Sequence, residues 1–216
     1  MKPLVFVNFK TYPEALGENG IELAREIAHV KTNKYTIVIA PTFPTLQTVV
    51  NLVHLPVFAQ HTDPVTSGAH TGSISGEELK AIRVQGTFLN HSEKPLSLKT
   101  IKETIALCKK NKLKTLVFAK DIPAIKHIVL FHPDYIAYEP PELVGGNVSV
   151  TTANPQIIRQ AVQAVKKMNP KVIFLVGAGI QSKQDIQTAL RLGAQGVVLA
   201  HAIVQSSPKK IRQILL

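Results

Sequence analysis

Short apolar segments alternate with longer amphipathic segments along the whole chain, and this alternation restricts the choice of fold more than any other feature. The apolar segments are rich in Val, Ile, Leu and Phe, and such near-continuous hydrophobicity is typical of strands covered on both faces of a parallel sheet. The predicted strands are residues 4–8, 35–40, 56–60, 86–90, 115–119, 135–138, 172–176 and 196–200. The predicted helices are residues 20–30, 45–53, 76–83, 98–111, 122–131, 155–167, 183–192 and 208–216.

Several predicted helices have recognisable starts. Asn154 offers a side-chain cap and is followed by Pro155, which is tolerated at the first helical position. Ser182 offers a capping hydroxyl, and Asp185 places an acid in the first turn of the same helix. Asp121 can cap the helix that begins at residue 122. These local signals agree with the boundaries that the hydrophobic pattern predicts.

The order of the segments favours an α/β fold of the (β/α)8 barrel type, in a short and compact form. Eight strand–helix pairs follow one another without interruption in 216 residues, whereas such barrels often take about 250 residues. A doubly wound open sheet would carry a glycine-rich turn after its first strand, but the first strand here ends in Asn8-Phe9-Lys10. No linker or low-complexity segment divides the chain, so we expect residues 1–216 to form one domain.

The composition narrows the classes of partner. Lys and Arg number 25 against 14 Asp and Glu, which gives a net charge of +11 that attracts anions. Aromatic residues make up only 6% and do not alternate with the basic clusters, so solvated basic helix faces are favoured over a nucleic-acid surface. No apolar run reaches the length of a membrane span. Cys108 is the only cysteine, and we expect a reducing, cytoplasmic location.

Three polar clusters stand at the ends of predicted strands. They are Asn8-Phe9-Lys10, Asn90-His91-Ser92-Glu93 and Tyr138-Glu139-Pro140-Pro141-Glu142. They supply an ammonium, an imidazole and a carboxylate. In a (β/α)8 barrel the C-terminal ends of the strands converge on one face, so these groups would meet at one mouth. We therefore expect a proton-transfer site for an anionic substrate.

These clusters, in this order, resemble the triosephosphate isomerase family. The opening Asn8-Phe9-Lys10-Thr11-Tyr12 and the segment Phe58-Ala59-Gln60-His61 are similar to its archaeal form, and the resemblance continues through Val176-Gly177-Ala178-Gly179-Ile180. It implies interconversion of dihydroxyacetone phosphate and D-glyceraldehyde 3-phosphate through an enediolate, in glycolysis and gluconeogenesis. We expect no cofactor and no metal ion.

The resemblance also implies a role for each group in the clusters. Glu139 would be the base that removes the proton beside the carbonyl, and His91 would be the neutral electrophile that polarises that carbonyl. Lys10 would balance the negative charge of the enediolate and the phosphate, and Asn8 would donate a hydrogen bond nearby. Glu93 would orient the lysine.

Further residues are expected to bind the substrate. Residues 140–150 resemble the family's lid, and the turns after strands 7 and 8 resemble its phosphate site. The full expected set is Asn8, Phe9, Lys10, Val144, Gly145, Gly177, Gly179, Ala200 and His201. Ala200-His201-Ala202 departs from the Ala-Ser-Gly typical of the family, so His201 would either clash with the phosphate or add a donor to it. We expect binding to be retained, with altered affinity or pH dependence.

The loop from Thr62 to Gly72 is expected to make contacts between subunits. His61, Asp63 and His70 lie in or beside this loop, but their spacing is weak evidence for a metal site. In the resembling family this loop reaches into a neighbouring subunit, which implies a homo-oligomer, either a dimer or a tetramer. Two alternatives stay open: another phosphate-binding (β/α)8 isomerase or lyase, and a catalytically weak barrel that acts as a basic RNA-binding protein.

Overall fold

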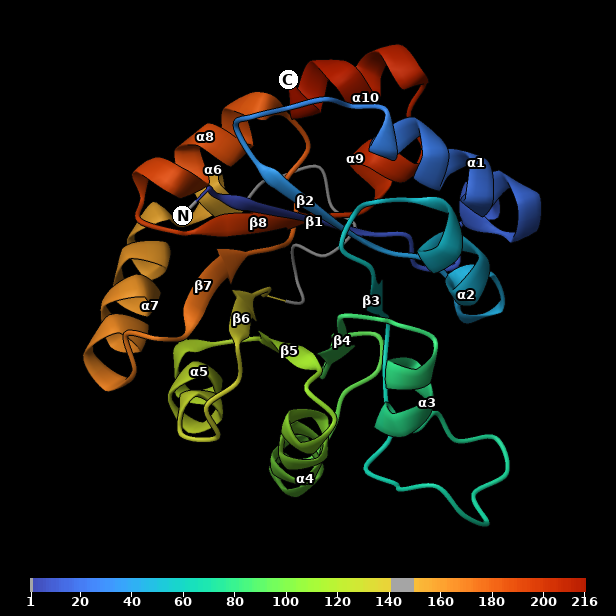
Figure 1. Cartoon of the computed structure of the whole chain (residues 1–216). Coiled ribbons are helices and arrows are strands. Elements are labelled where there is room, and N and C mark those ends of the chain that lie inside the picture. Colours follow the sequence, from blue (N-terminus) through green and yellow to red (C-terminus); the bar gives the residue numbers. More distant parts are fainter. Residues whose placement is uncertain (1, 141–149) are drawn as a thin grey trace.

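A parallel barrel with helices around it forms the centre of the molecule in a computed structural model that describes residues 2–140 and 150–216 (Figure 1). The strands are β1 (Leu4–Asn8), β2 (Thr36–Ala40), β3 (Phe58–Ala59), β4 (Gly86–Leu89), β5 (Lys114–Ala119), β6 (Tyr135–Tyr138), β7 (Ile173–Val176) and β8 (Gly196–Leu199). The helices are η1 (Pro13–Ala15), α1 (Gly17–Ala28), α2 (Phe43–Leu52), α3 (Gly76–Ala81), α4 (Leu98–Lys110), α5 (Ile122–Val129), α6 (Val150–Ala153), α7 (Pro155–Met168), α8 (Lys183–Arg191), α9 (His201–Val204) and α10 (Pro208–Leu215).

The sheet closes in the order that a (β/α)8 barrel requires. Its eight strands run β2-β1-β8-β7-β6-β5-β4-β3, and every pair between them is parallel. The circle closes between β2 and β3 through the single bridge Ile39–Val57. The predicted α/β barrel fold is therefore confirmed.

The third strand is the one strand whose predicted length is wrong. Residues 56–60 were expected to form it, but only Phe58 and Ala59 pair with β4. Pro56 has no N–H to donate, and Gln60 turns its side-chain amide to the carbonyl of Ala40 instead of continuing the ladder. The other strand predictions agree with the structure within one residue at each end.

Most helix predictions also hold. Asn154, Asp121 and Ser182 each accept a backbone N–H at their helix start, and Asp185 completes a capping box with Ser182. The first two helices begin earlier than expected, at Gly17 and Phe43. The short helices η1, α6 and α9 were not predicted, because three or four residues are too few for a hydrophobic period to be visible.

Side chains alternate between two cores. Those pointing into the barrel form an aromatic-rich cluster that includes Phe6, Phe58, Phe88, Phe118 and Tyr135, with ring centroids of neighbouring pairs 5.2 to 6.2 Å apart. The alternate residues pack between strands and helices in a second, larger cluster. Every second side chain along a strand points to the same face. The residue two positions after the last inward-facing side chain therefore faces the mouth of the barrel.

Candidate active site

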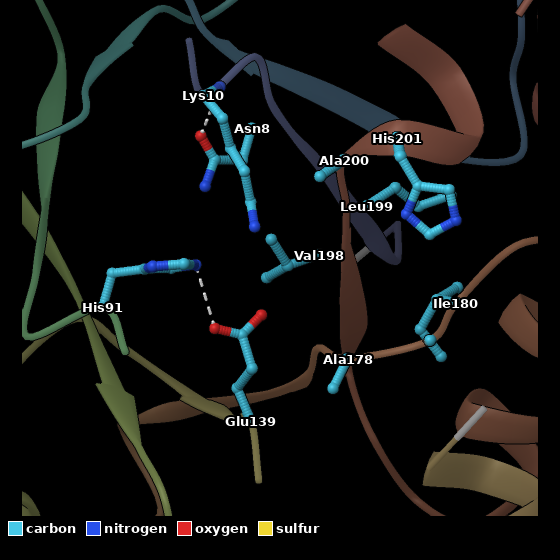
Figure 2. A pocket seen from close by; sticks show the side chains of 11 residues that line it. Asn8, Lys10, His91, Glu139, Ala178, Ile180, Val198, Leu199, Ala200 and His201 are labelled. Carbon is cyan, nitrogen blue, oxygen red and sulfur yellow. Dashed lines mark hydrogen bonds and ion pairs between the residues drawn. The ribbon is translucent and has the colours of Figure 1, made fainter. Parts of the chain in front are cut away.

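A pocket lies at the C-terminal mouth of the barrel (Figure 2). Two strands bring inward-facing side chains to this pocket. On β1, Asn8 follows the inward-facing Leu4 and Phe6. After β6, Glu139 follows the inward-facing Tyr135 and Ala137. The residues that line it are Asn8, Lys10, His91, Glu139, Ala178, Gly179, Ile180, Val198, Leu199, Ala200 and His201. The pocket thus gathers residues from both ends of the chain.

Lys10 is held in a backbone conformation that side chains rarely adopt. Its φ is +49°, in the left-handed region that disfavours residues with a Cβ. Its N–H donates to Asn8 Oδ1 at 3.0 Å, and its carbonyl accepts from Gln60 Nε2 at 3.0 Å. These two bonds stabilise the turn that aims the ammonium into the pocket. Because Asn8 Oδ1 faces Lys10, the amide nitrogen of Asn8 is left to donate elsewhere.

Glu93 connects the cation to the imidazole. Lys10 Nζ lies 2.7 Å from Glu93 Oε1, and the lysine side chain is 11% exposed while that of Glu93 is 56% exposed. The backbone N–H of Glu93 donates to His91 Nδ1 at 3.2 Å. Glu93 Oε2 also lies 3.5 Å from His91 Nδ1. Glu93 therefore contacts Lys10 through its carboxylate, and His91 through both its backbone and its carboxylate.

The hydrogen bond to Nδ1 determines the form of the His91 ring. A nitrogen that accepts a hydrogen bond carries no proton, so the proton of the neutral imidazole is on Nε2. Nε2 points into the pocket and lies 3.0 Å from Glu139 Oε2. The ring packs against the edge of Phe118, with centroids 4.8 Å apart. His91 is thus oriented to present an N–H donor to a molecule in the pocket.

Glu139 is a buried carboxylate with little support from its surroundings. It is 7% exposed, and its Oε2 accepts no hydrogen bond from any residue in the described parts of the chain. The contact with His91 Nε2 has the distance of an ion pair but lacks hydrogen-bond alignment. On its other side, a Cβ built at Gly177 would lie only 2.7 Å from Glu139 Oε1. The carboxylate therefore occupies space that a glycine leaves open.

The far side of the pocket carries backbone and a second imidazole. Ala178 and Gly179 have φ of +63° and +67°, and both line the pocket. His201 begins α9, and its ring is half-buried at the pocket rim. Burial lowers the pKa of His201, and the positive charges of Lys10 and Lys210 lower it further.

The structure places most of the expected site residues together. Lys10, His91, Glu139, Asn8, Gly179, Ala200 and His201 all line the pocket. Two others lie elsewhere: the Phe9 side chain is fully buried in the core between strands and helices, and Gly177 lies against the Glu139 carboxylate. The expected lid residues Val144 and Gly145 lie outside the described residues. Ala202, where the family typically has glycine, packs its methyl group in the core instead of in the pocket.

Some residues of the site were missed by the sequence reasoning. Gln60 follows β3 and holds the carbonyl of Lys10, and its place at a strand end is a signal that could have identified it. Ala178 follows β7 in the same way. Ser92 carries a buried hydroxyl that makes no hydrogen bond within the described parts of the chain, and its place in the cluster after β4 was recognised without a role for it.

The loop after β3 is held at its base and exposed at its tip. Asp63 accepts from the N–H of Ile74 at 2.8 Å and lies 3.0 Å from His61 Nε2. Burial alone would raise the pKa of Asp63, but the bonds to Ile74 and His61 and the charge of Lys94 outweigh it and lower that pKa. Residues 66–72 are exposed. Within residues 2–140 and 150–216, no three His, Cys, Asp or Glu side chains gather as a metal site would require.

Comparisons with known proteins identify relatives over nearly the full length. A sequence model described as triosephosphate isomerase matches residues 3–215. The chain is 41% identical over 215 residues to a triosephosphate isomerase from Methanocaldococcus jannaschii, which covers 98% of each chain. It is 41% identical over 209 residues to one from Methanobrevibacter smithii, covering 96% of this chain and 94% of the relative. None of the helices in the described parts of the chain has the length and apolar character to cross a membrane.

Proposed function

The chain belongs to the triosephosphate isomerase family and interconverts dihydroxyacetone phosphate and D-glyceraldehyde 3-phosphate, and we propose that Glu139, His91 and Lys10 carry out this reaction. The observation that carries the proposal is the 3.0 Å approach of His91 Nε2 to Glu139 Oε2 in a pocket that Lys10 also lines. A buried base and a neutral N–H donor so close together can act on adjacent atoms of one substrate.

The proposed reaction moves one proton between neighbouring carbons. Glu139 removes a proton from the carbon beside the carbonyl, and the electron pair of that C–H bond forms the enediolate. The Nε2–H of His91 donates to the carbonyl oxygen, where negative charge develops. The ammonium of Lys10 and the amide of Asn8 stabilise the same charge. His91 gives its Nε2 proton to the former carbonyl oxygen and takes up the proton of the neighbouring hydroxyl, so the new carbonyl forms on the other carbon. Glu139 then returns its proton to the carbon that held the original carbonyl, and both groups are regenerated.

The phosphate would lie on the far side of the pocket from Glu139. Ala178 to Ile180 and Leu199 to His201 line that side, and the backbone at Ala178 and Gly179 is in the left-handed region. Backbone N–H groups at such turns are suited to anions. The positive charge of Lys10 adds to the attraction. We infer that Gly179, Ala200 and His201 bind the phosphate, and the roles expected for Phe9, Gly177, Val144 and Gly145 stay predictions.

Isomerase assays on two single variants test the assignment. Glyceraldehyde 3-phosphate is converted by purified protein and the product is followed with a coupled dehydrogenase. Glu139→Gln removes the base while keeping its shape, and kcat is expected to fall at least about a hundredfold. His91→Gln is expected to lower kcat by a factor on the order of a hundred through lost polarisation of the carbonyl. Glu103→Gln, on the exposed face of α4, is the control and should keep the wild-type rate. Turnover of the Glu139 variant near that of the control would contradict the assignment.

We also propose that the chain assembles with copies of itself through the loop from Thr62 to Gly72. This loop extends away from the barrel between β3 and α3 (Figure 1). A second cavity, next to the first, is bordered by Gly72 and shares Lys10 and His91 with it. A loop from another copy could fill this cavity and restrain Lys10. Sedimentation tests this, because a species of 23.6 kDa at micromolar concentration would contradict assembly.

A further inference from the structure

The imidazole of His201 is the least explained group of the site. It stands where the family typically has a serine, and it lies on the side of the pocket away from His91 and Glu139 (Figure 2). Its ring projects from the first turn of α9, and Leu199 and Ile180 line the same pocket. Within the described residues, neither ring nitrogen makes a hydrogen bond, so both are available to a ligand.

The two charged groups that act most on His201 are positive. Lys10 acts on it from the turn after β1, and Lys210 acts on it from α10, which packs against α9. Across the cavity, the titratable groups that share the lining are His91 and Glu139. Burial and the charges of the two lysines lower the pKa of His201 when no anion is bound, which favours the neutral imidazole. An anion that binds beside this ring opposes the effect of the two lysines and favours uptake of a proton.

We propose that His201 is a phosphate-binding residue whose imidazole takes up a proton when a dianion enters the pocket, so that the site binds dianions more tightly as the pH falls. The inference rests on the proposed function, because the natural dianion is the phosphate of the triose substrate. It goes beyond that function, since it makes substrate affinity depend on a side chain that a serine could not replace.

The sign of the pH dependence follows from the charges. A dianion beside the ring offsets the repulsion from Lys10 and Lys210, so the pKa of His201 is higher in the complex than in the free protein. Affinity for the dianion therefore increases as the pH falls through the higher pKa of the complex. It becomes constant below the lower pKa of the free protein. A difference of one pKa unit between the two states corresponds to a tenfold change in affinity.

Inorganic sulfate is the probe of choice. A phosphate ester has its own second pKa near 6, so it loses charge in the same range in which His201 gains it. Sulfate stays a dianion throughout. Its inhibition constant against glyceraldehyde 3-phosphate is measured from pH 5.5 to pH 8.5 for the wild type, His201→Gln and His54→Gln. Glutamine keeps a hydrogen-bond donor but cannot be protonated, and His54 is an exposed histidine away from the site.

The expected results separate the two histidines. For the wild type and His54→Gln, sulfate should bind about tenfold more tightly at pH 5.5 than at pH 8. For His201→Gln the affinity for sulfate should change about twofold or less between the same two pH values. His91 is present in all three proteins, so it cannot cause a difference between their pH profiles. Equal pH profiles for wild type and His201→Gln would overturn the proposal.

A measurement on the wild type alone covers the case in which His201→Gln does not fold. Calorimetric titration with sulfate at pH 6.5, in two buffers of different ionisation enthalpy, should detect uptake of a fraction of a proton per site. Absence of proton uptake would overturn the proposal. A different result would contradict the proposed function itself, namely a wild-type protein that does not isomerise the triose phosphate at any pH. If the wild type is an active isomerase and His201→Gln has the same sulfate affinity at every pH, only the role of His201 is refuted.

Discussion

The contact between Gly177 and Glu139 gives the sharpest test of how the base is positioned. A methyl group at position 177 would lie 2.7 Å from Glu139 Oε1 and 3.3 Å from Cδ. Ordinary van der Waals contact begins at 3.4 Å, so the carboxylate must move by about 0.7 Å. Gly177 lacks a positive φ, and its N–H bond to the carbonyl of Tyr138, at 2.9 Å, does not involve a side chain. Gly177→Ala therefore displaces the base without straining the backbone.

The expected cost follows from that displacement. A misplacement of about 1 Å can reduce turnover on the order of a hundredfold, so Gly177→Ala should lower kcat by about ten- to a hundredfold. Sulfate inhibition should change little, because Gly177 is not part of the pocket lining. Gly76→Ala, at the start of α3, is the matched control, since the three atoms nearest to its added methyl belong to the side chains of Asn111 and Leu113. A kcat for Gly177→Ala within twofold of the control would refute the steric argument.

Two further predictions concern the support of Lys10 and the buried thiol. Gln60→Ala removes the donor to the carbonyl of Lys10 and should lower kcat about tenfold. The midpoint of thermal unfolding should shift by only a few degrees. A variant with wild-type turnover would exclude a positioning role for Gln60. Burial, and secondarily the charge of Asp134, raise the pKa of Cys108 to about 12. In the native protein at pH 8, Cys108 should therefore react slowly with thiol reagents that label it rapidly in denaturant. Equal labelling rates in the native and the denatured protein would show that α4 opens readily.

The sequence predicted the barrel, and the meeting of Asn8 and Glu139 at its mouth, because both depend on simple periodicities. A repeat of two residues places Asn8 and Glu139 on the inward face of β1 and β6, and barrel closure brings them together. The positions of Gly177 and Gln60 depend on distances across the barrel, which no local pattern contains. Gly177 was expected to bind the substrate, which stays a prediction, and the structure also places it against a carboxylate that follows the neighbouring strand.

The environment of His201 was equally hidden. The sequence identified it as a departure from the family pattern and left its effect open between a clash and an added donor. The structure places the ring at the pocket rim and packs the methyl group of Ala202 into the core. The charges that act on the ring come from Lys10 and Lys210, which are separated from each other by most of the chain. Only the folded arrangement brings both charges close enough to act on the ring.

One unbroken series of strand–helix pairs supports the proposal that residues 1–216 fold as a single domain. The single cysteine remains the basis for expecting a cytoplasmic location. A single cooperative unfolding transition, observed alike by circular dichroism and fluorescence of the tyrosines, is what one domain should give.

Hydrogen exchange during turnover tests the central claim, that Glu139 is the base, most directly. Dihydroxyacetone phosphate is incubated with enzyme in D2O, and deuterium on the carbon that loses its proton is followed by NMR. The wild type and Glu103→Gln should incorporate deuterium at equal rates, since a carboxyl base exchanges its proton with solvent between steps. Glu139→Gln should incorporate it at least about a hundredfold more slowly. Incorporation by Glu139→Gln at the wild-type rate would mean that another group removes the proton.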